Sequence, residues 1–172
     1  MTAQVLQELN IGSISIPGKF ITKCCNILAK RGSGKTYLAG VIEEEILKAG
    51  YPLVIVDPMG AHWGIREGYK LIVFGGPHAD IEIEPQDAEL LASCVIDNNL
   101  SCLVDLVEWD QDVAREFVAH FFNKLYQLNS TPRHIIIEEA DAFAPQSGGS
   151  GATKLAFKAV DNLVRRGRGK GI

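Results

Sequence analysis

The sequence lacks any apolar run of the roughly 20 residues that a membrane-spanning helix requires. Its first ten residues also lack the basic start and the apolar centre of a signal peptide. Cysteine is sparse, and the four residues show neither the density of a disulfide scaffold nor the C-x-x-C spacing of a zinc site. These absences predict a protein that does not associate with a membrane and that resides in the reducing cytoplasm.

An excess of positive charge is also missing, since 17 Lys and Arg residues stand against 21 Asp and Glu residues and give a net charge of −4. Mild acidity argues against contact with nucleic acid over the whole surface, but it allows a local basic patch. One such patch lies at residues 165–170. The composition, with 47% hydrophobic and 22% charged residues, is typical of a globular protein. We expect one domain over residues 1–172, long enough to bury its core without disulfides or metals.

Internal repeats are absent as well, and the glycine- and serine-rich stretch 147–151 is interpreted as a flexible loop. Apolar or β-branched runs predict strands buried on both faces, at residues 24–28, 53–56, 71–74, 102–106 and 134–137. Apolar residues at three- and four-residue spacing predict helices at 36–48, 110–128 and 154–165. This alternation predicts an α/β fold with a largely parallel sheet, whose ligands bind beyond the carboxyl ends of the strands.

A glycine-rich segment directly follows the first of these predicted strands. Residues 29–36 read AKRGSGKT and lead into a predicted helix. Gly32 and Gly34, with Ser33 between them, let the backbone turn its N–H groups inward, and the helix adds the positive end of its dipole. The segment therefore has the features of a phosphate-binding loop.

Two side chains at the end of this loop carry the expected chemistry. Lys35 is expected to reach the β- and γ-phosphates of a nucleotide, and Thr36 is expected to bind Mg²⁺. Ala29 departs from the usual pattern, which has glycine at that position, by a single methyl group. The alternative interpretation is a glycine-rich turn that only precedes a helix.

Two carboxylates end the most apolar predicted strand, at Glu138 and Glu139. A nucleotide bound at a phosphate loop needs one acid to hold Mg²⁺ and a second acid to orient and deprotonate the attacking water. Glu138 follows the last apolar residue and is expected to take the metal role, although Asp is more common there, while Glu139 is expected to act on the water. The alternative interpretation is that the two acids begin a solvated loop or cap a turn.

Four segments in chain order resemble the HerA/FtsK superfamily of ATPases, and its HerA-like branch in particular. They are residues 29–36, the sequence VIVDPMG at 54–60, the sequence EEADAFAP at 138–145 and the tail RRGRGKGI at 165–172. The resemblance covers about residues 20–172. It implies a three-layer RecA-like P-loop core and ring-shaped homo-oligomers, with a hexameric ring in the complete protein. It also implies ATP-driven movement of double-stranded DNA.

The resemblance assigns roles to the acids and the loop. Lys35 would bind phosphate and contribute to catalysis, and Thr36 would bind the metal. Glu138 stands at the Walker B metal position, and Glu139 stands at the position of the catalytic acid that activates water. ATP and Mg²⁺ are the implied cofactors.

A further motif of the family contains Asp57 and Gly60, close to the nucleotide. The residues alone favour another interpretation of 57–60, a β-turn with proline at its second position. His62 and Trp63 follow, and we expect them on a surface turn with a packed aromatic ring.

Rings of this kind bring an arginine from a neighbouring subunit to the γ-phosphate. Arg165, Arg166 and Arg168 are the candidates, with DNA contact, a helix end favoured by the dipole or a solvated tail as alternatives for the same run. The family's next strand carries a polar sensor residue and would begin near Ile172. We therefore expect the domain to be incomplete at its C-terminus.

Three functions stay open from the sequence. The first is an ATP-hydrolysing motor domain that translocates DNA. The second is a small P-loop kinase, which fits the length, although neither an acceptor site nor an arginine-bearing lid is evident. The third is a nucleotide-binding module without hydrolytic activity, which Glu138 at a position usually held by Asp supports.

Overall fold

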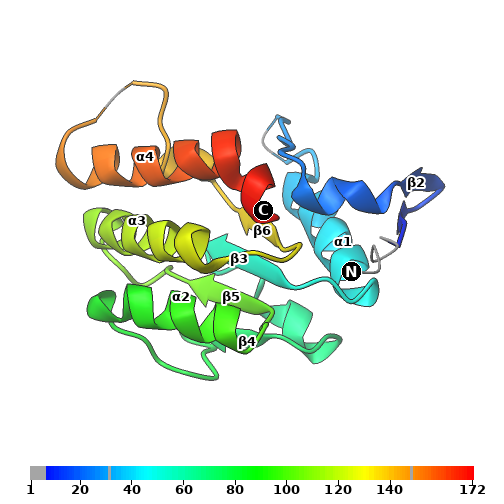
Figure 1. Ribbon diagram of the computed structural model, residues 1–172, viewed down its shortest axis with the longest axis horizontal. Helices are drawn as coiled ribbons and strands as arrows, with labels where there is room; N and C mark the ends of the chain where they lie inside the picture. The colour runs from blue at the N-terminus through cyan, green and yellow to red at the C-terminus, as the bar shows by residue number, and fades with distance from the viewer. Residues whose placement is uncertain (1–6, 31, 148) are drawn as a thin grey trace.

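The computed structural model describes residues 7–30, 32–147 and 149–172. Residues 1–6 and Arg31 lie outside the described residues, as does Gly148 in the stretch interpreted as a flexible loop. Figure 1 shows a sheet with helices on both of its faces. The predicted α/β fold, with a parallel sheet in a RecA-like P-loop core, is confirmed.

The central sheet consists of four parallel strands in the order β4, β5, β3, β6. Their bounds are β3 (Leu53–Asp57), β4 (Ile72–Phe74), β5 (Cys102–Asp105) and β6 (His134–Ile137). In the register, Val56 lies opposite Ile137, and Asp57 lies opposite Asp105. The carboxyl ends of β3, β5 and β6 therefore meet at one edge of the sheet, where the acidic residues gather.

Side chains of β3 alternate between two cores, as expected for a strand covered on both faces. Val54 and Val56 pack under three helices on one face, while Leu53 and Ile55 pack against a helix and a hairpin on the other. The first layer contains α2 (Ala88–Asp97), α3 (Gln111–Leu128) and α4 (Gly151–Arg166) (Figure 1). The second contains α1 (Lys35–Lys48) with the antiparallel pair β1 (Leu9–Ile11) and β2 (Ile14–Ile16).

Short 3₁₀ helices occupy several of the connections. They are η1 (Gly18–Thr22), η2 (Trp63–Glu67), η3 (Pro85–Asp87), η4 (Ala140–Ala142) and η5 (Gly167–Lys170). The predicted helices agree with α1, α3 and α4 to within a few residues. Helix α2 was not predicted, although Leu91, Ala92 and Val95 give it a buried face at helical spacing.

The predicted strand at 24–28 is wrong. The structure assigns no strand to residues 24–30, and Leu28 is 91% exposed. Both sides of β3 are taken by β5 and β6, and the other side of β6 faces a cavity of about 370 Å³ instead of a strand. Residues 25–28 line that cavity across from β6. The segment therefore has no neighbouring strand that would pair with it and bury it.

Residues after α4 fold back against the start of β6. The Arg133 N–H donates to the Gly171 carbonyl at 2.8 Å, and the Asn129 amide donates to the Lys170 carbonyl at 2.7 Å. The Arg133 side chain is itself buried and donates to the Leu100 carbonyl at 2.5 Å.

Through the described part of the chain, no helix is long and apolar enough to cross a membrane.

Candidate active site

The phosphate loop places the N-terminus of α1 at the surface. Gly34 precedes the helix with φ 90° and Gly32 has φ 76°, backbone conformations that favour glycine. No side chain caps α1 within the described residues. Because the first N–H groups of a helix have no partner inside it, and the helix dipole is positive there, this end of α1 is suited to bind an anion.

Ser33 closes the turn that leads into the helix. Its backbone N–H and its hydroxyl both donate to the Lys30 carbonyl, at 3.2 Å and 2.6 Å. The Leu38 N–H donates to the Gly34 carbonyl at 2.9 Å and begins the helical hydrogen-bond series. The loop residues Gly32, Ser33 and Gly34 are all exposed, so a ligand can reach the turn from solvent.

Lys35 and Glu139 come together from sites 104 residues apart in the sequence. Lys35 Nζ donates to Glu139 Oε1 at 2.8 Å, with the two side chains 33% and 42% exposed. This hydrogen bond is the main cause of a rise in the pKa of Lys35 above its usual value. The structure therefore brings together the loop lysine and the acid that the sequence assigned to catalysis.

Glu139 has an unusual backbone conformation. Its φ of 44° and ψ of 52° lie in the left-handed region, which non-glycine residues seldom adopt. Strand β6 ends at Ile137, and η4 begins at Ala140. Backbone strain of this kind clusters at functional sites, because only a well-supported loop maintains it.

A cavity of about 890 Å³ lies beside the loop and includes the Lys35–Glu139 pair in its lining. Thr36 lines it as well, together with Met59 and Gln111 from other segments. Its volume is within the range of roughly 300–1,000 Å³ that is usual for small-molecule sites. The cavity therefore has room for a nucleotide whose phosphates lie at the start of α1.

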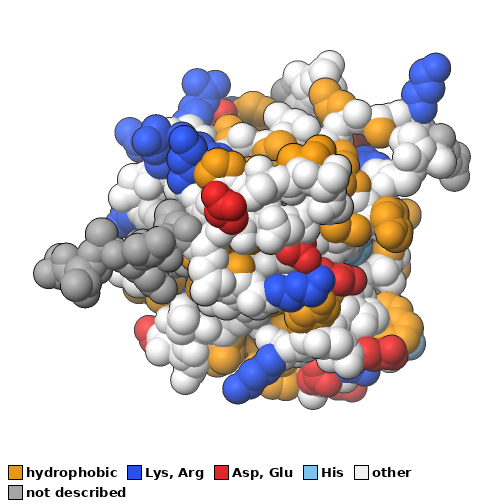
Figure 2. Space-filling model, turned by 90° about the vertical axis from the view of Figure 1, so that its right-hand side faces the viewer, with side chains coloured by type: hydrophobic (Ala, Val, Ile, Leu, Met, Phe, Trp, Pro, Cys, Tyr) orange, Lys and Arg blue, Asp and Glu red, His pale blue; other side chains and the backbone are white. Residues whose placement is uncertain are grey.

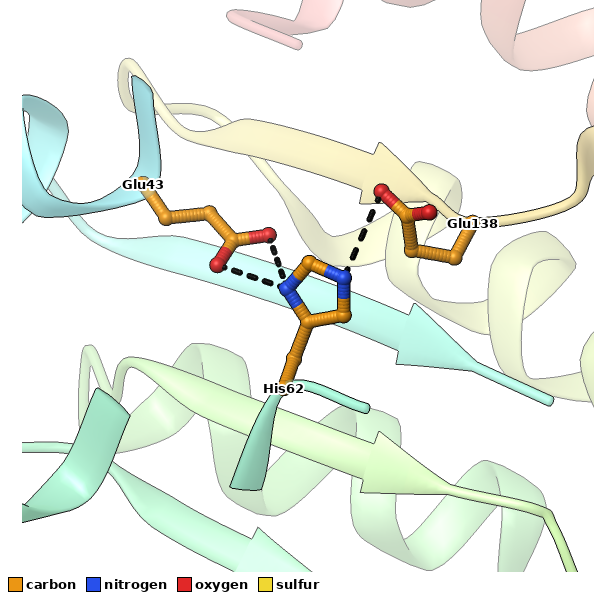
Figure 3. Close-up of side chains that lie close together, drawn as sticks. All are labelled: Glu43, His62 and Glu138. Atoms are coloured by element: carbon orange, nitrogen blue, oxygen red, sulfur yellow. Dashed lines mark hydrogen bonds and ion pairs between the residues drawn. The ribbon is translucent and has the colours of Figure 1, made fainter. Parts of the chain in front are cut away.

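The Glu138 carboxylate lies beside the ring of His62 (Figure 3). His62 Nε2 lies 3.6 Å from Glu138 Oε1, which is longer than a hydrogen bond, and His62 Nδ1 lies 2.9 Å from both oxygens of Glu43. All three residues are buried. Burial lowers the pKa of His62, but the adjacent Glu138 and Glu43 carboxylates outweigh it and raise this pKa to about 10.

Asp57 is fully buried and accepts four backbone hydrogen bonds. Its Oδ1 accepts from the N–H groups of Met59 and Gly60 at 2.8 and 3.0 Å, and its Oδ2 accepts from those of Ala61 and His62 at 2.6 and 3.0 Å. The predicted turn at 57–60 is thus built around the Asp57 carboxylate. A direct contact of Asp57 with the nucleotide stays a prediction.

The comparison with protein families decides the identity of the chain. The family described as the helicase HerA central domain matches residues 12–140, about three quarters of the sequence. The chain belongs to this family. The resemblance found in the sequence is confirmed, and with it a P-loop ATPase domain of the motor type. No curated protein matches the chain in sequence.

A P-loop ATPase of the HerA type binds a nucleotide with Mg²⁺, and the residues present fit both groups. The uncapped start of α1 and the Lys35 ammonium provide positive charge for phosphates. The exposed Thr36 hydroxyl and the Glu138 and Glu139 carboxylates are oxygen donors, which Mg²⁺ prefers. Lys35, Thr36 and Glu139 line the larger cavity, while Glu138 lines the smaller one that also contains Lys35.

Arg165, Arg166 and Arg168 are exposed at the end of α4 and the start of η5. Arg165 Nε donates to Asp161 Oδ1 at 2.6 Å within the same helix. Of the residues that the structure describes, these arginines do not line either cavity beside Lys35. Their position leaves them available to another molecule.

Two buried residues beside Glu138 were missed from the sequence. His62 was expected on a surface turn, and this is wrong, because the residue is only 6% exposed and the four hydrogen bonds to Asp57 fold its loop inward. Glu43 is 1% exposed between Ile42 and Ile46 on the buried face of α1. An acid within an apolar helical stripe is the signal that would have revealed it.

Proposed function

We propose that this chain binds ATP with Mg²⁺ and hydrolyses it, and that the hydrolysis drives movement along double-stranded DNA. The observation that carries the proposal is the contact of Lys35 with Glu139 in the lining of the phosphate-loop cavity. Membership in the HerA central domain family supports a motor-type ATPase. The exposed thiols of Cys24 and Cys25 support a reducing compartment, the cytoplasm.

In this proposal the phosphate chain lies on the backbone of Gly32, Ser33 and Gly34, and Lys35 contacts the β- and γ-phosphates. Lys35 then exchanges its carboxylate partner for phosphate oxygens, which releases Glu139. Glu139 accepts a proton from the attacking water as a general base, a role that contributes typically 10²- to 10⁴-fold. Its side chain is 42% exposed, so water reaches it directly.

Thr36 and Glu138 would hold Mg²⁺, which supplies charge neutralisation on the phosphate oxygens when bound. Thr36 follows the loop lysine and is exposed to the cavity. Glu138 lies one residue before the proposed base, on the side of the buried His62. The two neighbouring acids thus have separate duties.

Contact with DNA is proposed for a limited part of the surface. Figure 2 shows several Lys and Arg side chains close together at the upper left of the face in view, with single ones among the acidic and apolar side chains elsewhere. The exposed run Arg165, Arg166 and Arg168 offers clustered cations for DNA phosphates. The same arginines could instead reach the γ-phosphate of a neighbouring copy in a homo-oligomeric ring, where such a residue contributes about 10³-fold or more.

A nucleotide-binding module without hydrolysis is the second candidate. Both acids are engaged, since Glu139 pairs with Lys35 and Glu138 lies beside His62. If these contacts persist when a nucleotide binds, neither acid is available for its role. A kinase is less well supported, because Glu139 directly follows the proposed metal ligand and is exposed to water.

Measurement of phosphate release from ATP separates these functions. The purified chain is assayed with Mg²⁺, alone and with double-stranded or single-stranded DNA. A motor domain releases phosphate and is stimulated by double-stranded DNA. Nucleotide binding without release indicates the silent module, and transfer of phosphate to an added acceptor in place of release indicates a kinase.

The Lys35→Ala variant tests the phosphate loop itself. We expect its affinity for a nonhydrolysable ATP analogue to fall about 100-fold or more, because a charge-assisted contact with phosphate is lost. Lys35 is partly exposed and packs little, so circular dichroism should show an intact fold. Lys48→Ala, at an exposed lysine in the last turn of the same helix, is the matched control. Unchanged affinity in folded Lys35→Ala would contradict the proposed function.

A concentration series tests the arginines. If they act on a neighbouring copy, specific activity rises steeply with protein concentration, and Arg165→Ala, Arg166→Ala or Arg168→Ala removes that rise. If they contact DNA, the same variants lose DNA stimulation at every concentration. If a monomer hydrolysed ATP rapidly, with a specific activity that does not depend on protein concentration, the result would contradict the ring-motor interpretation.

A further inference from the structure

Three buried side chains form a continuous line from α1 to the end of β6. Figure 3 shows Glu43 and Glu138 on opposite sides of the His62 ring, each directed at a different ring nitrogen. Glu43 Oε2 accepts a hydrogen bond from Nδ1 at 2.9 Å, and Glu138 Oε1 lies 3.6 Å from Nε2. The three residues are separated by 19 and 76 positions in the sequence, so only the tertiary fold aligns them.

Residue His62 is held at two points, its backbone and its ring. The backbone N–H donates to Asp57 Oδ2, and three other N–H groups of the loop also donate to the Asp57 carboxylate. Its Nδ1 is held by Glu43, which belongs to the helix that begins at the phosphate loop. A carboxylate hydrogen-bonded to one nitrogen of a histidine sets the orientation of the ring and of the other nitrogen.

The other nitrogen, Nε2, is buried and has no hydrogen-bond partner among the described residues. The side chains of His62 and Glu43 are 4% and 1% exposed, so bulk solvent does not replace the missing partner. A buried polar atom without a partner is costly and calls for an explanation by function. Nε2 faces the Glu138 carboxylate, which a small rotation would bring within hydrogen-bond distance.

We propose that His62 is a positioning residue for Glu138, held in place by Glu43 and, through the 57–62 loop, by Asp57. This proposal rests on the proposed function, in which Glu138 binds Mg²⁺. Nε2 contacts one carboxylate oxygen of Glu138 and leaves the other oxygen for the metal. The ring thereby restricts the rotamers of a flexible glutamate before the metal binds, so less side-chain entropy is lost on binding.

The same geometry explains why Glu serves at a position usually held by Asp. Glutamate is one methylene longer than aspartate and has an additional rotatable bond, so its carboxylate needs a neighbouring group that fixes its orientation. His62 lies beside the Glu138 carboxylate and is itself held by hydrogen bonds to Asp57 and Glu43. In this proposal the motif at 57–60 acts on the metal site through His62, whose backbone N–H donates to Asp57.

A metal ion held jointly by Glu43, His62 and Glu138 is the alternative. Their ligand atoms lie within 4.8 Å of one another. However, the two carboxylates face different ring nitrogens, and Glu43 already accepts the hydrogen bond from Nδ1. One ion on the Nε2 side would not reach Glu43 while that hydrogen bond is kept.

Binding of Mn²⁺, followed by electron paramagnetic resonance in the presence of a nonhydrolysable ATP analogue, tests the proposal without any turnover. His62→Asn keeps a donor toward Glu43 but is too short to reach Glu138, whereas His62→Gln places a donor near the position of Nε2. We expect His62→Asn to weaken Mn²⁺ binding about 10-fold or more, as is usual for residues that orient a metal ligand, and His62→Gln to recover most of the loss. Glu43→Gln, whose amide oxygen still accepts from Nδ1, should weaken it less.

Affinity for the analogue in EDTA is the second measurement, and it should stay at the parent value in all three variants. His120, whose side chain is 60% exposed on α3, provides the matched controls His120→Asn and His120→Gln, which should change nothing. A purely structural role for His62 would lower the free energy of unfolding and both affinities together, with no difference between Asn and Gln. That result would overturn the proposal, as would tighter Mn²⁺ binding in His62→Asn.

Zn²⁺ titration without nucleotide closes the test. Tight Zn²⁺ binding by the parent that disappears in His62→Asn and Glu43→Gln would show a separate metal site and overturn the positioning role. Failure of the proposed function has a different signature, because the parent would then not bind the analogue and Lys35→Ala would make no difference. Unchanged Mn²⁺ binding in His62→Asn, with normal binding of the analogue by the parent, refutes only the role of His62.

Discussion

Glu138 and Glu139 are identical residues side by side in the sequence, and they occupy opposite environments. The Glu138 side chain is 10% exposed and lies beside a buried imidazole, whereas the Glu139 side chain is 42% exposed and pairs with the loop lysine. The backbone produces the difference, because Glu138 continues the line of β6 and Glu139 turns into the left-handed region. The comparison shows that the fold, and not the residue type, divides the work between the two acids.

The burial of each acid also suits a different chemistry. A metal ligand benefits from a fixed carboxylate that is shielded from competing water. A general base must instead contact water and pass on the proton that it accepts. The held position of Glu138 and the exposed position of Glu139 match these two requirements, and variants of each residue can test the division.

The largest expected effect is the loss of hydrolysis in Glu139→Gln. The amide keeps the size and hydrogen bonding of the side chain but accepts no proton, so phosphate release should fall about 10²- to 10⁴-fold. Affinity for the ATP analogue should stay within about twofold, because the contact of Lys35 with phosphate persists. Single-turnover phosphate release and calorimetry measure the two quantities. Parent-like hydrolysis in this variant would assign Glu139 a structural role.

The two acids should differ next in their contribution to stability. Removal of the carboxylate in Glu138→Ala leaves the buried His62 Nε2 without the group that it faces, which costs about 1–3 kcal/mol of unfolding free energy. Glu139→Ala removes an exposed ion pair, worth about 0–1 kcal/mol. Urea unfolding of both variants measures the difference. Equal losses would mean that the buried contact of Glu138 with His62 does not form in solution.

The next smaller expected difference between the two acids is in the Mg²⁺ concentration that nucleotide binding requires. Glu138→Gln should raise the Mg²⁺ concentration for half-maximal nucleotide binding about 10-fold, because an amide is a weaker ligand than a carboxylate. Glu139→Gln should leave this concentration close to the parent value. Titration of Mg²⁺ at a fixed concentration of a fluorescent ATP analogue gives both numbers. A larger shift in Glu139→Gln than in Glu138→Gln would exchange the proposed roles.

Sequence patterns predicted the parts of the molecule that depend on local order. Strands β3, β5 and β6 each contain at least three consecutive apolar residues, and the phosphate loop and α1 follow a fixed spacing, so each could be found within a short window. The position of Glu138 and Glu139 followed from the rule that ligands of a parallel sheet bind beyond the carboxyl ends of its strands. The direct contact of Lys35 with Glu139 was not predicted from the sequence.

The parts that were wrong or missed depend on distant residues. Residues 24–28 are apolar enough for a strand, but a strand also needs a neighbouring edge, and the edge of β6 borders a cavity instead. His62 resembled a surface residue because its loop is rich in turn formers. Its burial results from Asp57 and Glu43, which the local pattern does not connect to it.

The smallest expected effect concerns the backbone at residue 139, where Glu139→Gly and Glu139→Ala form a matched pair. Both variants lose the carboxylate and the contact with Lys35, so they differ mainly in backbone preference. Alanine keeps the strain of the left-handed conformation, roughly 1–2 kcal/mol, while glycine relieves it and pays about 0.5–1 kcal/mol in chain entropy. The glycine variant should therefore be more stable than the alanine variant by about 1 kcal/mol in urea unfolding. At the exposed Glu116 within α3 the order should reverse, because alanine is favoured over glycine inside a helix. If alanine were also favoured at 139, the left-handed turn that separates the two acids would not exist in solution, and their division of roles would need another cause.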